Sequence, residues 1–257
     1  MRDPGLTEAI RAAGGVSELA RQIGISQPSV SNWNRVPVER VLTVEAATGV
    51  HRTVLRPDVY PDASATERDD IAAARAHHYA LLATLLLHAP DADLLSRLSG
   101  LRGDGSALGT VHAALADAAA TAQADAVADE FFMLFIGVGR GELLPYASYY
   151  LTGFLHERPL ARLREDLNRF GIARADDIVE PEDHAGILCE IMAGLASGAL
   201  PAPDGADRTV FQKHMAPWIG RFFADLERAE TAEFYRSVGA LGRTFIALEA
   251  DAFALPS

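Results

Sequence analysis

The stretch that decides the fold reads Asp129-Glu-Phe-Phe-Met-Leu-Phe-Ile-Gly-Val-Gly139. Its apolar side chains recur at the spacing of one helix face, at Phe131, Leu134, Phe135 and Val138. Glycines at 137, 139 and 141 follow at once. Because glycine adopts positive φ values that other residues resist, these glycines are expected to end the helix. The stretch therefore predicts an amphipathic helix that needs a core and stops sharply.

The rest of the chain repeats this helical periodicity. From residue 67 onward every periodic segment has helical spacing, and no run alternates as a strand would. About nine helices are expected there, over 67–88, 91–98, 108–122, 124–138, 146–155, 159–170, 181–195, 208–228 and 230–253. The sequence thus predicts an all-α fold.

Composition narrows the class of protein. The chain has 257 residues, 49% of them hydrophobic, and a single cysteine, Cys189. Its longest apolar run is too short to span a bilayer, so no membrane insertion is expected. The first residues lack the apolar segment of a signal peptide, which predicts a cytoplasmic protein. One cysteine excludes an internal disulfide and argues against a cysteine-based metal site.

The net charge of −12 is unevenly distributed. Residues 1–61 contain seven arginines and six acidic residues, which gives a net charge of +1. Residues 62–257 contain the other 16 basic and 29 acidic residues, which gives −13. A strongly acidic body suits a basic partner, although good solubility explains the charge equally well. Pro57 and Pro61 with the polar segment after them indicate a boundary. We therefore expect a small domain over 1–61, a linker over 62–66 and a large domain over 67–257.

The first domain has the spacing of a helix-turn-helix. Short helices are expected over 6–13, 17–23 and 27–34, with Gly24 in the turn between the second and the third. Ala20 lets those two helices cross closely, and Pro28 suits the first turn of the third helix. The motifs Gly14-Gly-Val-Ser-Glu-Leu-Ala20 and Ile25-Ser-Gln-Pro-Ser-Val-Ser-Asn-Trp33 together resemble Cro/YdaS-type regulators.

That resemblance implies DNA binding through the polar face of the third helix. Gln27 and Asn32 carry the amide groups that can read adenine, whereas four other polar residues are better suited to phosphates, namely Ser29, Ser31, Asn34 and Arg35. The alternative is a helix-turn-helix that no longer binds DNA and serves docking or dimerisation. The near-neutral charge of the domain slightly favours this alternative, because phosphate contacts supply much of the affinity for DNA. The intact polar face of the third helix favours DNA binding instead.

Three further motifs follow the opening stretch in order. They are Pro145-Tyr-Ala-Ser-Tyr-Tyr150, Glu180-Pro-Glu-Asp-His184 and His214-Met-Ala-Pro-Trp218. Together with Glu130 and the Leu134-Phe135 pair, this order resembles the TorD-like family of chaperones that mature bacterial molybdoenzymes. The resemblance implies a TorD-like all-helical chaperone domain over 67–257.

In that family, the loop matching Glu180, Pro181, Asp183 and His184 helps to bind the twin-arginine signal peptide of the partner enzyme. The resemblance places Pro145, Tyr146, Ser148 and Tyr149 in the same groove. Both segments also have a purely structural interpretation. Residue 181 suits the first position of a helix with acidic residues at its positive end, and tyrosines often line the edge of a core. The segment 172–179 is of the kind that hinges two helical halves.

No catalytic constellation is visible. The glycines of 137–141 follow a helix and no Lys-Ser/Thr pair follows them, so they do not form a nucleotide loop. His77 and His78 lie on adjacent helix faces and are not expected to share a metal. Cys189 and Trp218 have apolar neighbours and are expected to be buried. The sequence predicts neither an enzyme nor a cofactor or metal site.

The resemblance to TorD-like chaperones implies the function of a cytoplasmic chaperone. It would bind the twin-arginine leader of a molybdoenzyme precursor and assist cofactor insertion before export. The sequence does not select among clients of the dimethyl sulfoxide reductase, trimethylamine oxide reductase and formate dehydrogenase types. The alternatives are a transcription regulator whose body senses the peptide, and an adaptor without DNA activity. Operator DNA is a possible second partner and would favour a homodimer.

Overall fold

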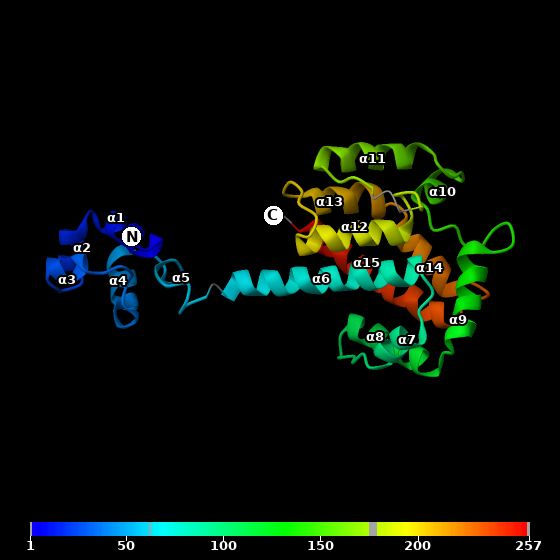
Figure 1. Ribbon diagram of the computed structural model, residues 1–257, viewed down its shortest axis with the longest axis horizontal. Helices are drawn as coiled ribbons and strands as arrows, with labels where there is room; N and C mark the ends of the chain where they lie inside the picture. The colour runs from blue at the N-terminus through cyan, green and yellow to red at the C-terminus, as the bar shows by residue number, and fades with distance from the viewer. Residues whose placement is uncertain (1, 62, 175–178, 256–257) are drawn as a thin grey trace. The chain divides into compact units, whose positions relative to one another are not determined.

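The computed structural model describes residues 2–61, 63–174 and 179–255, with the backbone alone for 63–66. The chain forms two compact units, Met1–Ile71 and Ala72–Ser257, which are drawn in Figure 1. Within the described ranges all regular structure is helical, apart from one isolated bridge between Tyr146 and His184. The predicted all-α fold class is therefore confirmed.

The N-terminal unit consists of short helices around one small core. The elements are α1 (Pro4–Ala13), α2 (Val16–Gln22), α3 (Gln27–Ser31), η1 (Val38–Arg40), α4 (Val41–Thr48) and α5 (Arg52–Leu55). Each larger helix contributes fully buried side chains, including Leu6, Leu19, Val30, Val44 and Leu55. The apolar stripes predicted for the first three helices thus meet in one core.

The turn between α2 and α3 has the predicted chemistry. Gly24 has a φ of 70°, and the N–H of Ile25 donates to the carbonyl of Ala20 at 3.0 Å. Ala20 is only 2% exposed, as a close crossing of the two helices requires. Helix α3 is shorter than predicted and ends at Ser31. The chain turns after that residue, and the N–H of Trp33 donates to the carbonyl of Val30.

Helix α6 (Ala63–Leu87) begins inside the segment expected to be a linker. Its first residues are rich in alanine and acidic or basic residues that favour helix, and no glycine or proline follows Pro61 until Pro90. The boundary between the compact units falls within this helix, after Ile71. Helical propensity therefore extends through residues 63–66, which the composition had indicated as a linker between the two domains.

The C-terminal unit contains the remaining helices. They are α7 (Ala92–Ser99), α8 (Ala107–Thr121), α9 (Ala124–Phe131), η2 (Phe132–Ile136), α10 (Ala147–Thr152), α11 (Arg158–Phe170), α12 (Ala185–Ser197), α13 (Ala206–Val210), η3 (Phe211–Met215), α14 (Ile219–Arg228) and α15 (Phe234–Ala254). Helix α15 packs against α14, α8 and α9, and α11 packs against α10 and α13 (Figure 1). No described helix is long and apolar enough to cross a membrane.

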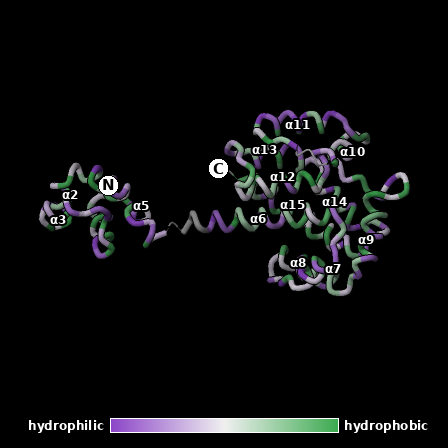
Figure 2. The backbone as a smooth tube through the Cα atoms, viewed as in Figure 1, coloured by the Kyte–Doolittle hydropathy of each residue, from purple (hydrophilic) through white to green (hydrophobic). Residues whose placement is uncertain are grey.

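One large core fills this unit. Its fully buried aromatic side chains come from distant parts of the chain, namely Tyr79, Phe211, Trp218, Phe222 and Tyr235. Figure 2 shows the contrast between α12, which is pale to green, and α11, which carries much more purple. Helix α11 therefore buries one leucine face and presents its charged face outward.

The opening stretch forms α9 and continues into the π-helical turn η2. Leu134 is fully buried, as predicted. Gly137 has a φ of 63°, and a Cβ built there would lie 2.1 Å from the carbonyl oxygen of Arg140. The helix ends there, so Val138 leaves the apolar face and is 96% exposed, contrary to the prediction that it would pack inward.

Glu130, in the same stretch, caps a helix far along the chain. Its carboxylate accepts hydrogen bonds from the backbone N–H groups of Glu233, Phe234 and Tyr235 at 2.8, 3.1 and 2.8 Å. The first N–H groups of α15 have no partners within the helix, and a carboxylate also suits the positive end of its dipole. Glu130 therefore connects α9 to α15.

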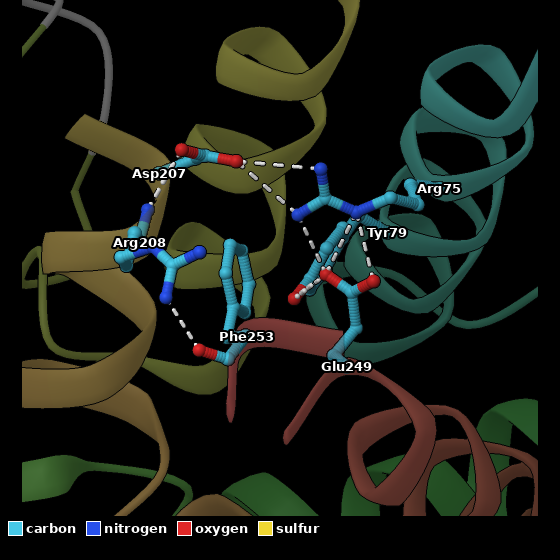
Figure 3. Close-up of polar contacts among 6 residues, drawn as sticks. All are labelled: Arg75, Tyr79, Asp207, Arg208, Glu249 and Phe253. Atoms are coloured by element: carbon cyan, nitrogen blue, oxygen red, sulfur yellow. Dashed lines mark hydrogen bonds and ion pairs between the residues drawn. The ribbon is translucent and has the colours of Figure 1, made fainter. Parts of the chain in front are cut away.

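A partly buried ion network connects α6, α13 and α15 (Figure 3). The guanidinium of Arg75 on α6 donates to both carboxylate oxygens of Glu249 on α15, at 2.8 to 3.1 Å. It also contacts Asp207 on α13 at 3.3 Å, and the hydroxyl of Tyr79 donates to Glu249 at 2.9 Å. Glu249 is only 3% exposed, so its charge depends on these partners.

The helix predicted over 208–228 is not continuous. It is divided into α13, η3 and α14, with a turn at residues 216–218. Pro217 has no N–H to donate to the preceding turn, which explains the break. The indole N–H of Trp218 then donates to the carbonyl of His214 at 2.7 Å, and the ring is 1% exposed, as expected for a core residue.

Candidate functional site

Two motifs that lie about 35 residues apart in sequence pair side by side. The N–H of Ala185 donates to the carbonyl of Pro145 at 2.7 Å, and the N–H of Ala147 donates to the carbonyl of Asp183 at 2.9 Å. This short antiparallel pairing brings the Pro145–Tyr150 motif against the Glu180–His184 motif. All eight residues predicted for peptide binding therefore belong to one region.

Asp183 lies inside this pairing rather than on the surface. Its Oδ2 accepts the backbone N–H of Ser148 at 2.8 Å, and the residue is 1% exposed. The other oxygen, Oδ1, has no hydrogen-bond partner among the described residues, and neither has the buried hydroxyl of Ser148. Asp183 thus holds the two motifs together while one buried carboxylate oxygen remains unpaired.

His184 is the N-cap of α12. Its Nδ1 accepts the N–H of Gly186 at 3.0 Å, and its ring meets the ring of Tyr146 edge-on with centroids 5.1 Å apart. The side chain is 5% exposed, and burial lowers its pKa to about 4. The imidazole is therefore neutral near neutral pH, as its acceptor role at Nδ1 also requires.

The cap position corrects the expected start of this helix. Helix α12 begins at Ala185, so Pro181 is not in its first turn and Asp183 does not lie at its positive end as a dipole partner. His184 has the extended conformation of an N-cap, with a φ of −67° and a ψ of 136°, and it forms the bridge to Tyr146, so helix α12 starts only at Ala185. The expected hinge segment, 172–179, lies partly outside the described residues, because 175–178 are not described.

The more accessible residues of the two motifs also have partners. The hydroxyl of Tyr146 donates to Glu180 at 2.7 Å, and burial together with this carboxylate raises the pKa of Tyr146. Tyr149 lies under the guanidinium of Arg140. Of the eight predicted residues, four are buried (Pro145, Ser148, Asp183, His184) and four are half-buried (Tyr146, Tyr149, Glu180, Pro181).

An exposed apolar rim covers the last turn of α10 and the turn that follows it. Leu151, Phe154 and Leu155 are 43, 70 and 40% exposed. Next along the chain, His156 has a φ of 60°, a conformation that side chains other than glycine rarely adopt. Our sequence prediction missed this rim. The signal that could have found it is the placement of apolar residues in a turn marked by Gly153 and His156, where polar residues are usual.

Two cavities flank this region. The larger has a volume of about 520 Å³ and lies between α10, α11 and η3, with Leu151, Arg162, Asp183, Lys213 and Pro217 among its lining residues. The smaller has a volume of about 100 Å³ and is lined by Tyr146, Ser148, Leu155, His156, Pro181 and Asp183. Asp183 contributes to both, and each cavity adjoins the apolar rim.

A charged cluster forms part of the wall of the larger cavity. Asp166 on α11 contacts His214 Nε2 at 2.9 Å, Lys213 Nζ at 3.4 Å and Arg169 Nη1 at 3.0 Å. Burial raises the pKa of Asp166, but the hydrogen bonds from His214 and Lys213 outweigh it and lower the pKa overall. Burial lowers the pKa of His214 despite Asp166. This wall is therefore polar and anchored, in contrast to the apolar rim.

In the N-terminal unit, the residues predicted to contact DNA are at least partly accessible. Gln27, Ser29, Asn32, Asn34 and Arg35 are exposed and Ser31 is half-buried. Two of these side chains already have partners within the unit. The amide of Gln27 donates to the hydroxyl of Ser31 at 2.8 Å, and Arg35 contacts the exposed Asp58 at 3.2 Å. Both contacts are solvent-accessible, so they can exchange for contacts to DNA.

No metal site emerges from the part of the chain that the structure describes, because no group of three or more histidine, cysteine or acidic residues is arranged to hold an ion. His78 instead contacts His112 of α8, with 3.1 Å between the two Nε2 atoms. Cys189 is fully buried, as predicted, and burial raises the pKa of its thiol. The thiol is therefore protonated near neutral pH and unreactive.

Two family models match the chain in separate segments. The model described as nitrate reductase delta subunit matches residues 102–224, and the model described as bacterial toxin YdaS matches residues 6–64. The first match covers α8 to most of α14 and contains both paired motifs. The second covers the helix-turn-helix unit.

Curated relatives match about half of the chain. The chaperone protein TorD of Vibrio cholerae is 30% identical over 129 residues, and that of Aliivibrio fischeri is 29% identical over 130 residues. The chaperone protein YcdY of Escherichia coli is 29% identical over 120 residues. These alignments cover 47% of this chain and 59 to 61% of the relatives, so the chain spans about 60% of their length. A solved structure, a putative redox enzyme maturation protein from Archaeoglobus fulgidus, aligns with 67% of this chain and 93% of its own at 21% identity and a TM-score of 0.43.

The fold and the matches together define the class: an all-helical unit that resembles TorD-like chaperones, joined to a helix-turn-helix unit. More specifically, the resemblance of the C-terminal unit to the TorD-like family and of the N-terminal unit to the YdaS type are both confirmed. The three curated relatives are named chaperones, in agreement with the expectation that the chain is not an enzyme.

Proposed function

We propose that the C-terminal unit is a chaperone that binds the twin-arginine leader of a molybdoenzyme precursor in the cytoplasm and holds the precursor until cofactor insertion is complete. Such a leader has a basic segment followed by an apolar segment. A binding site for it needs an exposed apolar surface beside carboxylates. That combination is what the paired motifs and the rim offer.

The observation that carries this proposal is the rim of Leu151, Phe154 and Leu155 between two cavities. Scattered exposed apolar residues need no explanation, but three within five residues at the end of α10, beside hollowed surface, indicate a binding site. An apolar peptide segment that covers the rim would bury side chains that are now between 40 and 70% exposed. Burial of that area favours binding.

The electrostatics support the same occupant. The body carries most of the chain's negative charge, and the half-buried Glu180 accepts a hydrogen bond from Tyr146, which lines the small cavity. An acidic surface attracts a basic segment and raises its association rate. Asp183 and His184 contribute mainly indirectly, because their hydrogen bonds fix the backbone of the two motifs. Their direct contact with the peptide stays a prediction.

The test is a binding titration of the purified full chain with a fluorescently labelled leader peptide. The double variant Leu151→Ser/Phe154→Ser should weaken binding by about tenfold or more, because each exposed side chain contributes apolar area. Leu248→Ser is the matched control, since Leu248 on α15 is 45% exposed and lies outside the rim. Equal affinity of all three proteins would exclude the rim as the binding surface.

A second function is proposed for the N-terminal unit, namely specific binding of operator DNA that turns the protein into a peptide-sensing regulator. The observation that favours it is the exposed polar face of α3, with Gln27, Ser29 and Asn32 all accessible. Two copies would bind a palindromic site. A selection from random oligonucleotides at low salt tests it. A preferred site whose affinity falls with Gln27→Ala supports the proposal, and recovery of no preferred sequence contradicts it.

A further inference from the structure

The N-terminal unit is nearly neutral as a whole, but its charges are unevenly distributed along the chain. The six acidic residues of 1–61 are Asp3, Glu8, Glu18, Glu39, Glu45 and Asp58. Residues 19–38, which include α3 and the loop after it, therefore contain no acid, whereas they contain Arg21 and Arg35. The net charge of +1 thus hides a segment in which every ionised side chain is basic.

Most arginines of the unit are neutralised by ion pairs. Four such pairs are present, namely Arg11 with Glu8, Arg21 with Glu18, Arg52 with Glu45 and Arg56 with Asp58. Within the described ranges Arg2 has no such pair, and its Nη2 donates instead to the neutral carbonyl of Ser31 at 3.4 Å. The side chain is exposed, so its positive charge remains available to a partner.

Arg2 lies beside the end of α3. The carbonyl that it contacts belongs to Ser31, the last residue of that helix. The N–H of Asp3 donates to the carbonyl of Asn34 at 2.7 Å, which fixes the backbone next to Arg2 against the segment that leaves α3. Arg35 follows directly in that segment and is also exposed. Two exposed arginines from distant positions in the sequence therefore adjoin the same end of the helix.

The acid that contacts Arg35 is shared with a second arginine. Asp58 accepts two hydrogen bonds from Arg56, both at 2.7 Å, and contacts Arg35 at a longer 3.2 Å. The hydrogen bonds from Arg56 are the main reason why the pKa of Asp58 is lowered to about 2. One carboxylate therefore serves two guanidinium groups, and its shorter contacts go to Arg56. The charge of Arg35 is only partly compensated.

We propose that Arg2 binds a phosphate of duplex DNA, next to the phosphate contact expected of Arg35. The inference rests on the second function proposed above and adds a residue that the sequence did not assign to DNA. Guanidinium suits this role because its planar set of N–H donors matches phosphate oxygens. Exposed arginines beside a segment without acid also create a local positive potential, although the unit is nearly neutral overall. Such contacts would fix the position of α3 on the duplex while Gln27 and Asn32 read bases.

The experiment measures how the affinity for DNA depends on salt. The purified full chain is titrated into a fluorescein-labelled duplex of mixed sequence, about two helical turns long, at salt concentrations from about 50 to 200 mM. Wild type is compared with Arg2→Ala, Arg2→Lys and Arg11→Ala. Arg11→Ala is the matched control, because it removes the same charge from an exposed arginine that pairs with Glu8 inside α1. The melting temperature of each variant is measured alongside.

Arg2→Ala should reduce the slope of the logarithm of affinity against the logarithm of salt concentration by about 0.9 for each bound copy, because one phosphate contact fewer releases fewer counterions. Since the two lines converge toward high salt, the same variant should bind about tenfold more weakly at about 50 mM salt. Arg2→Lys should keep the slope, because ammonium also neutralises a phosphate. Arg11→Ala should leave the slope nearly unchanged.

A slope for Arg2→Ala equal to that of the wild type would overturn the assignment of Arg2, as would an equal reduction in Arg11→Ala. Failure of Arg2→Lys to keep the slope would overturn it too, because the effect would then not be one of charge. In each case operator binding by the N-terminal unit still stands if Gln27→Ala weakens a preferred site. Absence of wild-type binding to any duplex at the lowest salt concentration would overturn both the role of Arg2 and the proposed binding of DNA.

Discussion

Replacing Arg75 by methionine should strongly destabilise the C-terminal unit. Glu249 is 3% exposed and would keep only the hydroxyl of Tyr79 as a partner among those described (Figure 3). Breaking a buried ion pair by removal of one partner costs about 3–5 kcal/mol, because the other charge is left uncompensated. The contact of Arg75 with the more exposed Asp207 adds little. The expected loss is therefore about 4 kcal/mol.

For a unit of this size, about 4 kcal/mol corresponds to a fall in melting temperature of roughly 8–16 °C. The assay is urea denaturation followed by tryptophan fluorescence. The chain has two tryptophans, one in each unit, so a Trp33→Phe background makes Trp218 the only reporter. The signal then describes the unit that contains the network.

A second variant separates the lost pair from lost packing. Glu249→Gln removes the buried charge and keeps an acceptor for Tyr79, so Arg75→Met/Glu249→Gln should recover most of the stability that Arg75→Met loses. A loss below about 1 kcal/mol in Arg75→Met, or a double variant no more stable than the single one, would refute the reasoning.

Three further perturbations follow from the geometry. The pKa of His184 is lowered from 6.5 to about 4, so its contribution to stability is present above pH 6.5 and is lost as pH falls toward 4. His184→Asn keeps a capping oxygen, and in urea titrations over that pH range it should remove up to about 3 kcal/mol of the pH dependence of the unfolding free energy. His156→Gly relieves a left-handed backbone and should raise the free energy of unfolding by up to about 1 kcal/mol, whereas a lower denaturation midpoint would show that the φ of 60° is not strained. Glu130→Ala removes the acceptor of three N–H groups at the start of α15 and should cost about 1–2 kcal/mol in thermal unfolding, with an unchanged melting temperature as the contrary outcome.

The sequence alone was sufficient for those features that depend on neighbours three or four residues apart. The apolar face around Leu134, the glycine stop at Gly137 and the turn at Gly24 all follow from local spacing and local φ preferences, and the structure has each of them. The order of the motifs was also sufficient to indicate both family resemblances. Such information is carried by the chain itself, because helical periodicity and glycine conformation do not need a distant partner.

Only the tertiary structure decided which motif residues are accessible. Asp183 and His184 belong to a charged and polar motif that, from sequence, would face a basic peptide, yet they are 1 and 5% exposed. Their burial arises because residues 145–148 pair with residues 183–185, a contact between segments that no local pattern announces. The same pairing moves the start of α12 to Ala185 and leaves Oδ1 of Asp183 without a hydrogen-bond partner among the described residues. Local propensity sets each helix, but the burial of a side chain and the partners of its polar atoms depend on which distant segment packs against it.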